Sequence, residues 1–341
     1  MEISRLKAHD DCVPIQDCHG RIGIFRALHL GDMLCAVPAL RALRAGCHKA
    51  HITLIGLPSA AEWAARYPHY LDDFLPFPGH PQLPELRVSE GRYRAFVAHL
   101  PNDFEWLIQL HGDGSLTNGI LAEWPTRHRA GFVAKGECHN PGFVPYPAGH
   151  EIDRLLVLAC HLGGRGSADL EFPLRSEDFA RLKGTAAFAD LFDNEYVVVH
   201  PGSRAPSRRL APEFFEDVIA FLAERVRVVL TGSAAEWDLN AGLAHAGPGV
   251  INAAGLTSLG ALGALIAGAR CVVTNDSGPS HLCAALHTPS LVIVSGSDPD
   301  RWAPKNRRLH RLLDVRAGLV PERLTDAVAE LWEQTGRVLP C

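Results

Sequence analysis

The sequence of 341 residues has no apolar run that approaches the roughly 18 residues of a membrane-spanning helix. Residues 1–20 carry three aspartates and have no apolar centre, so they do not resemble a secretion signal. An excess of positive charge is also missing, because 33 Lys and Arg stand against 38 Asp and Glu. Nucleic acids call for a basic face, so we expect no nucleic-acid partner. These absences predict a cytoplasmic protein, in which any membrane contact is peripheral and at the inner face of the cytoplasmic membrane.

Metal and cofactor motifs are missing too. The nine cysteines include no CxxC pair, and without an export signal they indicate reduced thiols. Cys12, Cys18 and His19 have the residue types of metal ligands, but no second ligand pair follows at a suitable spacing. The sequence has no GxGxxG after its first predicted strand, no GxxxxGK(S/T), no GxSxG and no HExxH. We therefore expect neither a metal nor a cofactor, and neither a nicotinamide dehydrogenase nor a P-loop hydrolase.

The sequence does have a regular alternation of apolar strands and helices, which runs twice along the chain. This rhythm predicts an α/β protein with parallel sheets covered by helices. Strands are expected at residues 21–27, 51–57 and 106–110, and again at 196–200, 226–231, 271–274 and 290–295. The length favours two domains with a cleft between them, residues 1–185 and 186–320. Residues 321–341 contain an amphipathic helix, which we expect to dock back on the first domain.

The stretch that organises the second half follows its third predicted strand. A polar elbow after residue 274 leads into a helix that is expected to open at Pro279. The free N–H groups and positive dipole end of such a helix form an anion site. Asp276, Ser277 and His281 surround it with groups that bind hydroxyls and phosphates. We interpret the elbow as a diphosphate site; the alternative is that Asp276 or Ser277 only caps the helix.

Polar residues also follow the first strand. Gly31 allows close approach of a substrate, and Asp32 stands at the start of a helix. Asp32 is a candidate general base that takes a proton from an acceptor hydroxyl. Its alternative role is helix capping.

A basic loop follows the strand at residues 196–200. It contains Ser203, Arg204, Arg208 and Arg209, and several arginines between a strand and a helix suit phosphate oxygens. The alternative is a solvated basic loop.

Two further positions lie after strands of the second half. Glu236 is placed to accept hydrogen bonds from ribose hydroxyls, or else is an exposed helix residue. Thr257 belongs to a loop of small residues that suits the wall of a flat base, although Thr257 and Ser258 also fit the cap of the next helix.

Several short motifs follow one another along residues 21–304. They are LGDM at 30–33, VPALRALR at 37–44, HPGS at 200–203, RR at 208–209, TG at 231–232, AGLTSL at 254–259 and NDSGPSHL at 275–282. In order and spacing they resemble the signatures of glycosyltransferase family 9, the heptosyltransferase-type glycosyltransferases. The resemblance implies a GT-B fold of two Rossmann-like domains, with the acceptor on the first and the nucleotide sugar on the second. It also implies inverting, metal-independent transfer from ADP-heptose, commonly to the inner core of lipopolysaccharide.

The resemblance assigns roles residue by residue. It places Asp32 at the family's base and Arg208 at a basic residue on the donor diphosphate. It also assigns donor contacts to Glu236, Thr257, Asp276, Ser277, Gly278 and His281. One departure is Leu210, which stands where the family often has tryptophan. We expect this change to alter the packing beneath the arginine loop.

Two other functions stay open at this point. A nucleotide-sugar epimerase or hydrolase uses the same two-domain cleft, and a nucleotide-sugar-binding protein that has lost catalysis is also compatible with Leu210. A fold does not fix a substrate, so a small-molecule acceptor remains an alternative to a glycan.

Overall fold

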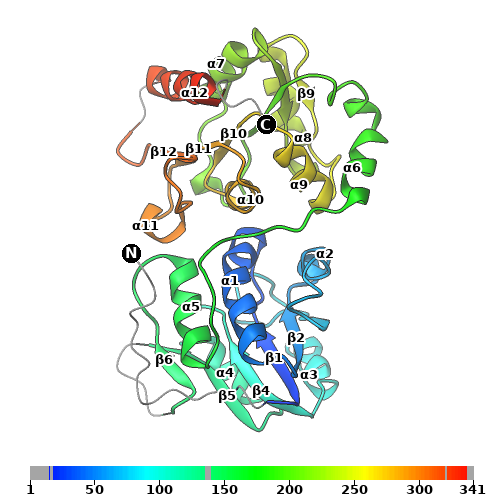
Figure 1. Cartoon of the computed structure of the whole chain (residues 1–341), viewed down its shortest axis with the longest axis vertical. Helices are drawn as coiled ribbons and strands as arrows, with labels where there is room; N and C mark the ends of the chain where they lie inside the picture. The colour runs from blue at the N-terminus through cyan, green and yellow to red at the C-terminus, as the bar shows by residue number, and fades with distance from the viewer. Residues whose placement is uncertain (1–14, 16–17, 135–139, 319–320, 336–341) are drawn as a thin grey trace. The chain divides into compact units, whose positions relative to one another are not determined.

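The computed structural model describes Ile15 and residues 18–134, 140–318 and 321–335. The chain divides into two compact units, residues 1–169 and 170–341 (Figure 1). Each unit contains one six-stranded sheet, and all strand pairs are parallel. The α/β prediction is therefore confirmed. Cys12, one of the residues considered as a metal ligand, lies outside the described residues.

The sheet of the first unit has the order β3-β2-β1-β4-β5-β6. Its strands are β1 (Arg21–Phe25), β2 (His51–Gly56), β3 (Asp73–Pro76), β4 (Phe104–Gln109), β5 (His128–Val133) and β6 (Phe143–Pro145). The central strands are almost wholly buried, because helices cover the sheet and leave no strand face to water. Asp32 and His111 follow the carboxyl ends of β1 and β4 along the chain.

The helices of the first unit follow these strands along the chain. They are α1 (Leu30–Gly46), η2 (Pro58–Ala60), α2 (Ala61–Ala64), α3 (Glu90–Ala98), α4 (Thr117–Ala122) and α5 (Glu151–His161). Helices α1 and α5 lie side by side (Figure 1). The α1 helix is apolar on most of its surface and buried along most of its length, and it packs against α5.

The sheet of the second unit has the order β12-β11-β10-β7-β8-β9. Its strands are β7 (Tyr196–His200), β8 (Arg227–Leu230), β9 (Ile251–Asn252), β10 (Val272–Asn275), β11 (Ser290–Val294) and β12 (His310–Asp314). The helices are α6 (Ser176–Lys183), η3 (Ala186–Phe188), η4 (Pro206–Arg208), α7 (Glu213–Ala223), η5 (Ala234–Glu236), α8 (Trp237–Leu243), η6 (Ala244–Ala246), α9 (Leu259–Ala267), α10 (Gly278–Leu286), α11 (Pro299–Trp302) and α12 (Pro321–Thr335). The strand order changes direction between β7 and β10, which is where open α/β sheets bind ligands.

The boundary between the units differs from the predicted one at residue 185. The division falls after Asp169, because α6 packs against α9 of the second unit. Phe172, which precedes α6 in the chain, also lies against α9, because a Cβ added at Gly263 of α9 would be 2.5 Å from the Phe172 ring. The pairing of α6 with α9 joins segments that are far apart in the sequence.

The C-terminal helix α12 packs in a different place from the one we expected. We expected it to dock on the first domain, but α12 packs against α7 and the β11–β12 edge of the second unit (Figure 1). Leu324, Val328 and Leu331 are buried in the same core cluster as Val218 and Leu222 of α7. The apolar face of α12 is thus covered within its own unit.

A buried histidine in β12 makes the second unit sensitive to acid. Burial, with smaller contributions from His287 and Arg307, lowers the pKa of His310 from 6.5 to about 4, and the ring bonds the Ser290 hydroxyl at 2.9 Å. Between these pH values the unfolded chain binds a proton that the folded chain does not, so stability is full above pH 6.5 and falls as the pH drops towards 4.

His310→Asn, which keeps a polar atom near Ser290, is expected to remove this sensitivity. Urea unfolding at pH 8 and pH 5 should show that the wild type loses about 2 kcal/mol more than the variant over this interval. Equal losses in the two proteins would rule out His310 as a source of the acid sensitivity.

Candidate active site

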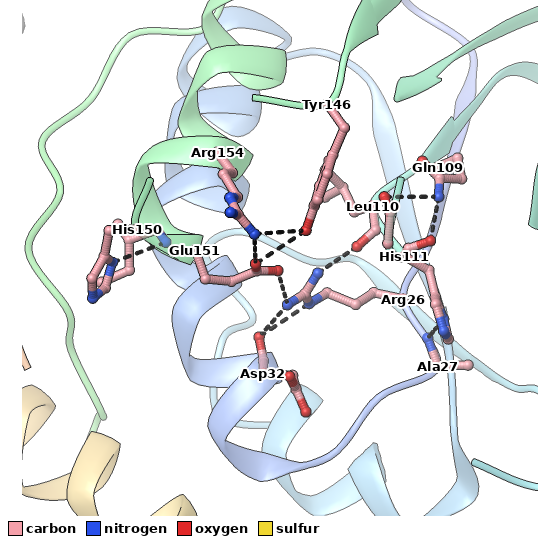
Figure 2. A network of polar contacts seen from close by, with 12 residues as sticks. Arg26, Ala27, Asp32, Gln109, Leu110, His111, Tyr146, His150, Glu151 and Arg154 are labelled. Atoms are coloured by element: carbon pink, nitrogen blue, oxygen red, sulfur yellow. Dashed lines mark hydrogen bonds and ion pairs between the residues drawn. The ribbon is translucent and has the colours of Figure 1, made fainter. Parts of the chain in front are cut away.

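Asp32 is the third residue of α1, which begins at Leu30 after a short connection from the end of β1 at Phe25. His29 is the N-cap and makes no side-chain capping bond, so capping is not the role of either residue in the structure. The Asp32 side chain is half-buried, and no hydrogen bond or ion pair to its carboxylate occurs within the described part of the chain. Figure 2 shows the carboxylate directed away from Arg26, whose guanidinium binds the Asp32 main chain. Asp32, with half-buried Gly31 before it, therefore has a free acceptor group at a helix N-terminus.

The predicted elbow of the second unit joins β10 to α10. The helix begins at Gly278, one residue before the expected start, and Ser277 is its N-cap without a side-chain capping bond. The Ser277 hydroxyl instead donates to the carbonyl of Asn275 at 3.1 Å. Asp276 is only 3% exposed, and its Oδ1 has no hydrogen-bond partner among the described residues. Capping therefore explains neither Asp276 nor Ser277.

His281 lies one turn into α10. Its ring is buried and meets the Trp302 ring edge-on, with centroids 6.4 Å apart. The structure thus brings four of the predicted residues together at one strand–helix junction. They are Asp276, Ser277, Gly278 and His281.

Asn275 is a buried residue whose role the sequence did not reveal. Its amide nitrogen donates to the Pro201 carbonyl at 2.7 Å, and its amide oxygen accepts from the Leu210 N–H at 3.2 Å. One side chain thus joins the elbow to both ends of the basic loop after β7. Leu210, at the position where family 9 often has tryptophan, is buried in the core cluster of this unit.

Arg208 and Arg209 of the basic loop differ in their contacts. Arg209 donates to the Ser203 carbonyl, and its guanidinium lies 3.6 Å from the Glu236 carboxylate. Arg208 is exposed, and in the described chain no hydrogen bond or ion pair holds its guanidinium. Arg209 is therefore occupied within the protein, whereas Arg208 is available to a ligand. Ser203 is buried at the base of the loop.

Glu236 is buried, so the alternative of an exposed helix residue is wrong. Its carboxylate accepts from the Ser233 N–H at 2.8 Å and from the Ser233 hydroxyl at 2.9 Å, which makes a capping box. A Cβ at Gly202 would lie 2.1 Å from Glu236 Oε1, so a larger residue at this position of the HPGS motif would push the Glu236 carboxylate out of its capping box.

Thr257 lies in the loop before α9 and is half-buried. Ser258, not Thr257, caps that helix by accepting from the Ala261 N–H at 3.3 Å. The loop contacts the Glu236 region, since a Cβ at Gly255 would lie 2.9 Å from Ala234. Thr257 thus stays available for another role.

His200 ends β7 beneath these loops. Its ring bonds the Thr231 hydroxyl at 3.1 Å, and burial lowers the pKa of His200 to about 4 although the Glu236 charge opposes the shift. The ring is neutral at pH 7, so it adds no positive charge to the site.

The first unit contains a polar network that the sequence did not reveal. Arg26 and Glu151 are buried charged residues 3.4 Å apart, and Tyr146 and Arg154 contact the same carboxylate (Figure 2). No local pattern marks them, because Arg26 ends an apolar strand and Glu151 starts a helix 125 residues later.

His111 lies at the same end of the first sheet. Its Nδ1 accepts from the Ala27 N–H at 3.2 Å, which directs Nε2 to Glu85 at 3.8 Å. The nearby His111 ring lowers the pKa of Glu85. Glu85 Oε2 is buried and has no partner among the described residues, so it is a further acceptor at this edge.

The described residues contain neither a cluster of metal ligands nor a helix that could cross a membrane. The described residues contain no group of three or more His, Cys, Asp or Glu side chains that could hold a metal ion. Cys18 donates to Glu105 at 3.3 Å, and burial raises the pKa of the Cys18 thiol to about 12. Within residues 18–134, 140–318 and 321–335, no helix has the length and apolar character needed to cross a membrane.

Two curated relatives resemble the chain over most of its length. Lipopolysaccharide heptosyltransferase 2 of Salmonella typhimurium is 27% identical, across 82% of this chain and 84% of that protein. Lipopolysaccharide heptosyltransferase 2 of Escherichia coli is 26% identical, across 90% of this chain and 91% of that protein.

Solved structures resemble the fold at lower identity. The family 9 glycosyl transferase of Veillonella parvula has a TM-score of 0.75 at 16% identity and covers 92% of this chain and 97% of that one. Escherichia coli heptosyltransferase WaaC with ADP has a TM-score of 0.67 at 18% identity and covers 91% of this chain and 99% of that one. The predicted GT-B fold is thereby confirmed.

The family model described as glycosyltransferase family 9 (heptosyltransferase) matches residues 102–324. This match spans the strand ends and loops of the second unit that hold the candidate donor residues. The chain is a glycosyltransferase and belongs to glycosyltransferase family 9.

Proposed function

We propose that the enzyme transfers a heptose from ADP-heptose to a hydroxyl of the lipopolysaccharide inner core, with inversion at the sugar and without a metal. The names of the two curated relatives support the sugar and the acceptor, and the WaaC structure with ADP supports the nucleotide. Asp276 carries most of the physical support, because its buried, unpaired oxygen needs a hydrogen-bond donor. Hydroxyls of a bound sugar supply such donors.

The donor site lies at the carboxyl ends of β7, β8 and β10. The N-terminus of α10, with Ser277 and Gly278, binds the diphosphate through its dipole and free N–H groups. Arg208 adds an exposed positive charge beside the diphosphate. Asp276 and His281 contact the sugar.

The nucleoside binds beside the diphosphate in this proposal. Glu236 accepts from the ribose hydroxyls, and its capping box with Ser233 fixes the carboxylate in place. Thr257 contributes to the wall beside the adenine, and Ser203 supports the loop that carries Arg208.

The reaction is a single displacement. An acceptor hydroxyl gives its proton to Asp32, its oxygen bonds to the anomeric carbon, and the bond from that carbon to the diphosphate oxygen breaks. ADP leaves with the electron pair, and attack opposite the leaving group inverts the sugar. Arg208 and the dipole of α10 stabilise the charge that grows on ADP, which is the protein's substitute for a metal.

Nucleotide preference tests the donor assignment. Thermal-shift titrations with ADP, UDP, GDP and their sugars should give the largest stabilisation with ADP and ADP-heptose, because ligands that bind only the folded state raise the melting temperature. A preference for UDP would overturn the donor.

Arg208→Ala is expected to weaken ADP binding by about tenfold or more, because a charge-assisted hydrogen bond is worth about 1.5–3 kcal/mol. Isothermal titration with ADP measures the effect. Arg225→Ala is the matched control: it removes the same charge from an exposed position of the second unit, where Arg225 contacts only α7 and Glu224 among the described residues. Unchanged ADP affinity in Arg208→Ala would remove this residue from the donor site.

A further inference from the structure

A buried ion pair lies at the end of β1 in the first unit. Arg26 and Glu151 are 1% and 2% exposed, and Arg26 Nη2 lies 3.4 Å from Glu151 Oε1. Burying two charges is costly, and a buried pair often stabilises a fold no better than apolar side chains of the same size. Its presence therefore calls for a role besides stability.

The contacts of Arg26 point to that role. Nε and Nη2 donate to the carbonyl oxygen of Asp32 at 3.0 and 2.8 Å, and Nη1 donates to the carbonyl of Leu110 after β4 (Figure 2). The planar guanidinium holds the first turn of α1 against two strand ends. It fixes the backbone of Asp32 and leaves the carboxylate free.

Glu151 completes the arrangement from the first turn of α5. Its Oε2 accepts from the Tyr146 hydroxyl at 3.2 Å and lies 3.7 Å from Arg154, so the carboxylate is held from both sides. The negative charge of Glu151 offsets that of Arg26 next to Asp32. A guanidinium bound directly to the Asp32 carboxylate would instead compete for the proton-accepting oxygens.

We propose that Arg26 and Glu151 are positioning residues, which aim the Asp32 carboxylate at the acceptor hydroxyl by holding its main chain. This rests on the proposed function of Asp32 as the base. Small displacements of a reacting group cost large factors in rate, about 10²-fold for 1 Å. The pair should therefore act on kcat and not on donor binding.

The test replaces both members of the buried pair together, so that neither Arg26 nor Glu151 is left without the other. Arg26→Met combined with Glu151→Met is expected to stay folded, with a melting temperature near that of the wild type and unchanged ADP affinity. Its kcat should fall by about 10²-fold while the KM for the donor stays the same. Arg26→Lys keeps the charge but not the two guanidinium N–H groups that donate together to the Asp32 carbonyl. Its kcat should fall by about tenfold.

Arg44→Lys is the matched control. Arg44 lies at the other end of α1 and donates to the carbonyls of Tyr70 and Ala50 and to Asp72, so it has the same kinds of contact. We expect Arg44→Lys to leave kcat unchanged. Equal losses in Arg44→Lys and Arg26→Lys would show a general effect on α1 and overturn the proposal.

Combination with Asp32→Asn separates this inference from the proposed function. If the pair acts through the base, adding the Met substitutions to Asp32→Asn should cause no further loss of kcat. A further 10²-fold loss would overturn the positioning role while Asp32 stays the base. An active Asp32→Asn enzyme would overturn the base, and the positioning role with it.

Discussion

Asp32→Asn is expected to lower the rate of heptose transfer by about 10³-fold and to leave ADP binding unchanged. A positioned general base contributes about 10²–10⁴-fold, and an asparagine amide cannot accept the acceptor's proton. The substitution conserves size, and no hydrogen bond to the Asp32 carboxylate within the described chain would be lost. Single-turnover transfer from ADP-heptose measures the rate, and titration calorimetry measures ADP affinity.

The control for this substitution is Asp103→Asn. Asp103 is an exposed carboxylate of the same unit that pairs with Arg21 at 3.4 Å, so the variant has the same change in charge. Its activity should equal that of the wild type. Normal turnover by Asp32→Asn would show that another group takes the proton, and Glu85, with its unpaired oxygen, would be the next candidate.

Asn275→Ala is expected to reduce the free energy of unfolding of the second unit by about 2–6 kcal/mol. The substitution leaves the Pro201 carbonyl and the Leu210 N–H without their partner, and each buried unpaired group costs about 1–3 kcal/mol. Asn275→Asp should be at least as damaging, because it buries a carboxylate against the Pro201 carbonyl. ADP affinity should fall as well, since the same amide holds the basic loop beside the elbow.

Asn252→Ala is the comparison for this loss. Asn252 also makes one donated and one accepted bond, to the Trp237 carbonyl and from the Ala254 N–H, but its side chain is only half-buried. Water can replace those bonds, so we expect a loss of about 1 kcal/mol. Urea unfolding of both variants measures the difference. Equal losses would show that the buried amide of Asn275 has no special role in joining the loops.

Uninterrupted apolar runs predicted the central strands well. β7 and β11 are buried at every position, and only a parallel sheet with covered faces accommodates such runs. The edge strands β3, β6 and β12 carry exposed or charged residues and lack this signal. The domain boundary was missed for a related reason, because the contact between α6 and α9 joins distant segments.

Within the candidate sites, too, local sequence patterns were predictive and contacts between distant segments were not. Although their roles remain proposals, the positions of Asp32 and of the elbow at Asp276 were predictable, because polar residues shortly after a buried strand are a local pattern. Arg26 and Glu151 were not, because their pairing spans 125 residues and each alone resembles an ordinary strand end or helix start. Leu210, which raised doubt about the packing beneath the basic loop, proves to be a buried core residue whose N–H is held by Asn275.

The most direct test of glycosyl transfer compares ADP-heptose consumption with and without an inner-core lipopolysaccharide acceptor. We predict that ADP is released only when the acceptor is present, that one heptose is added for each ADP, and that the new glycosidic bond has the anomeric configuration opposite to that of the donor. Consumption of ADP-heptose at the same rate without acceptor, giving free heptose or an epimer, would contradict the account and favour a hydrolase or an epimerase.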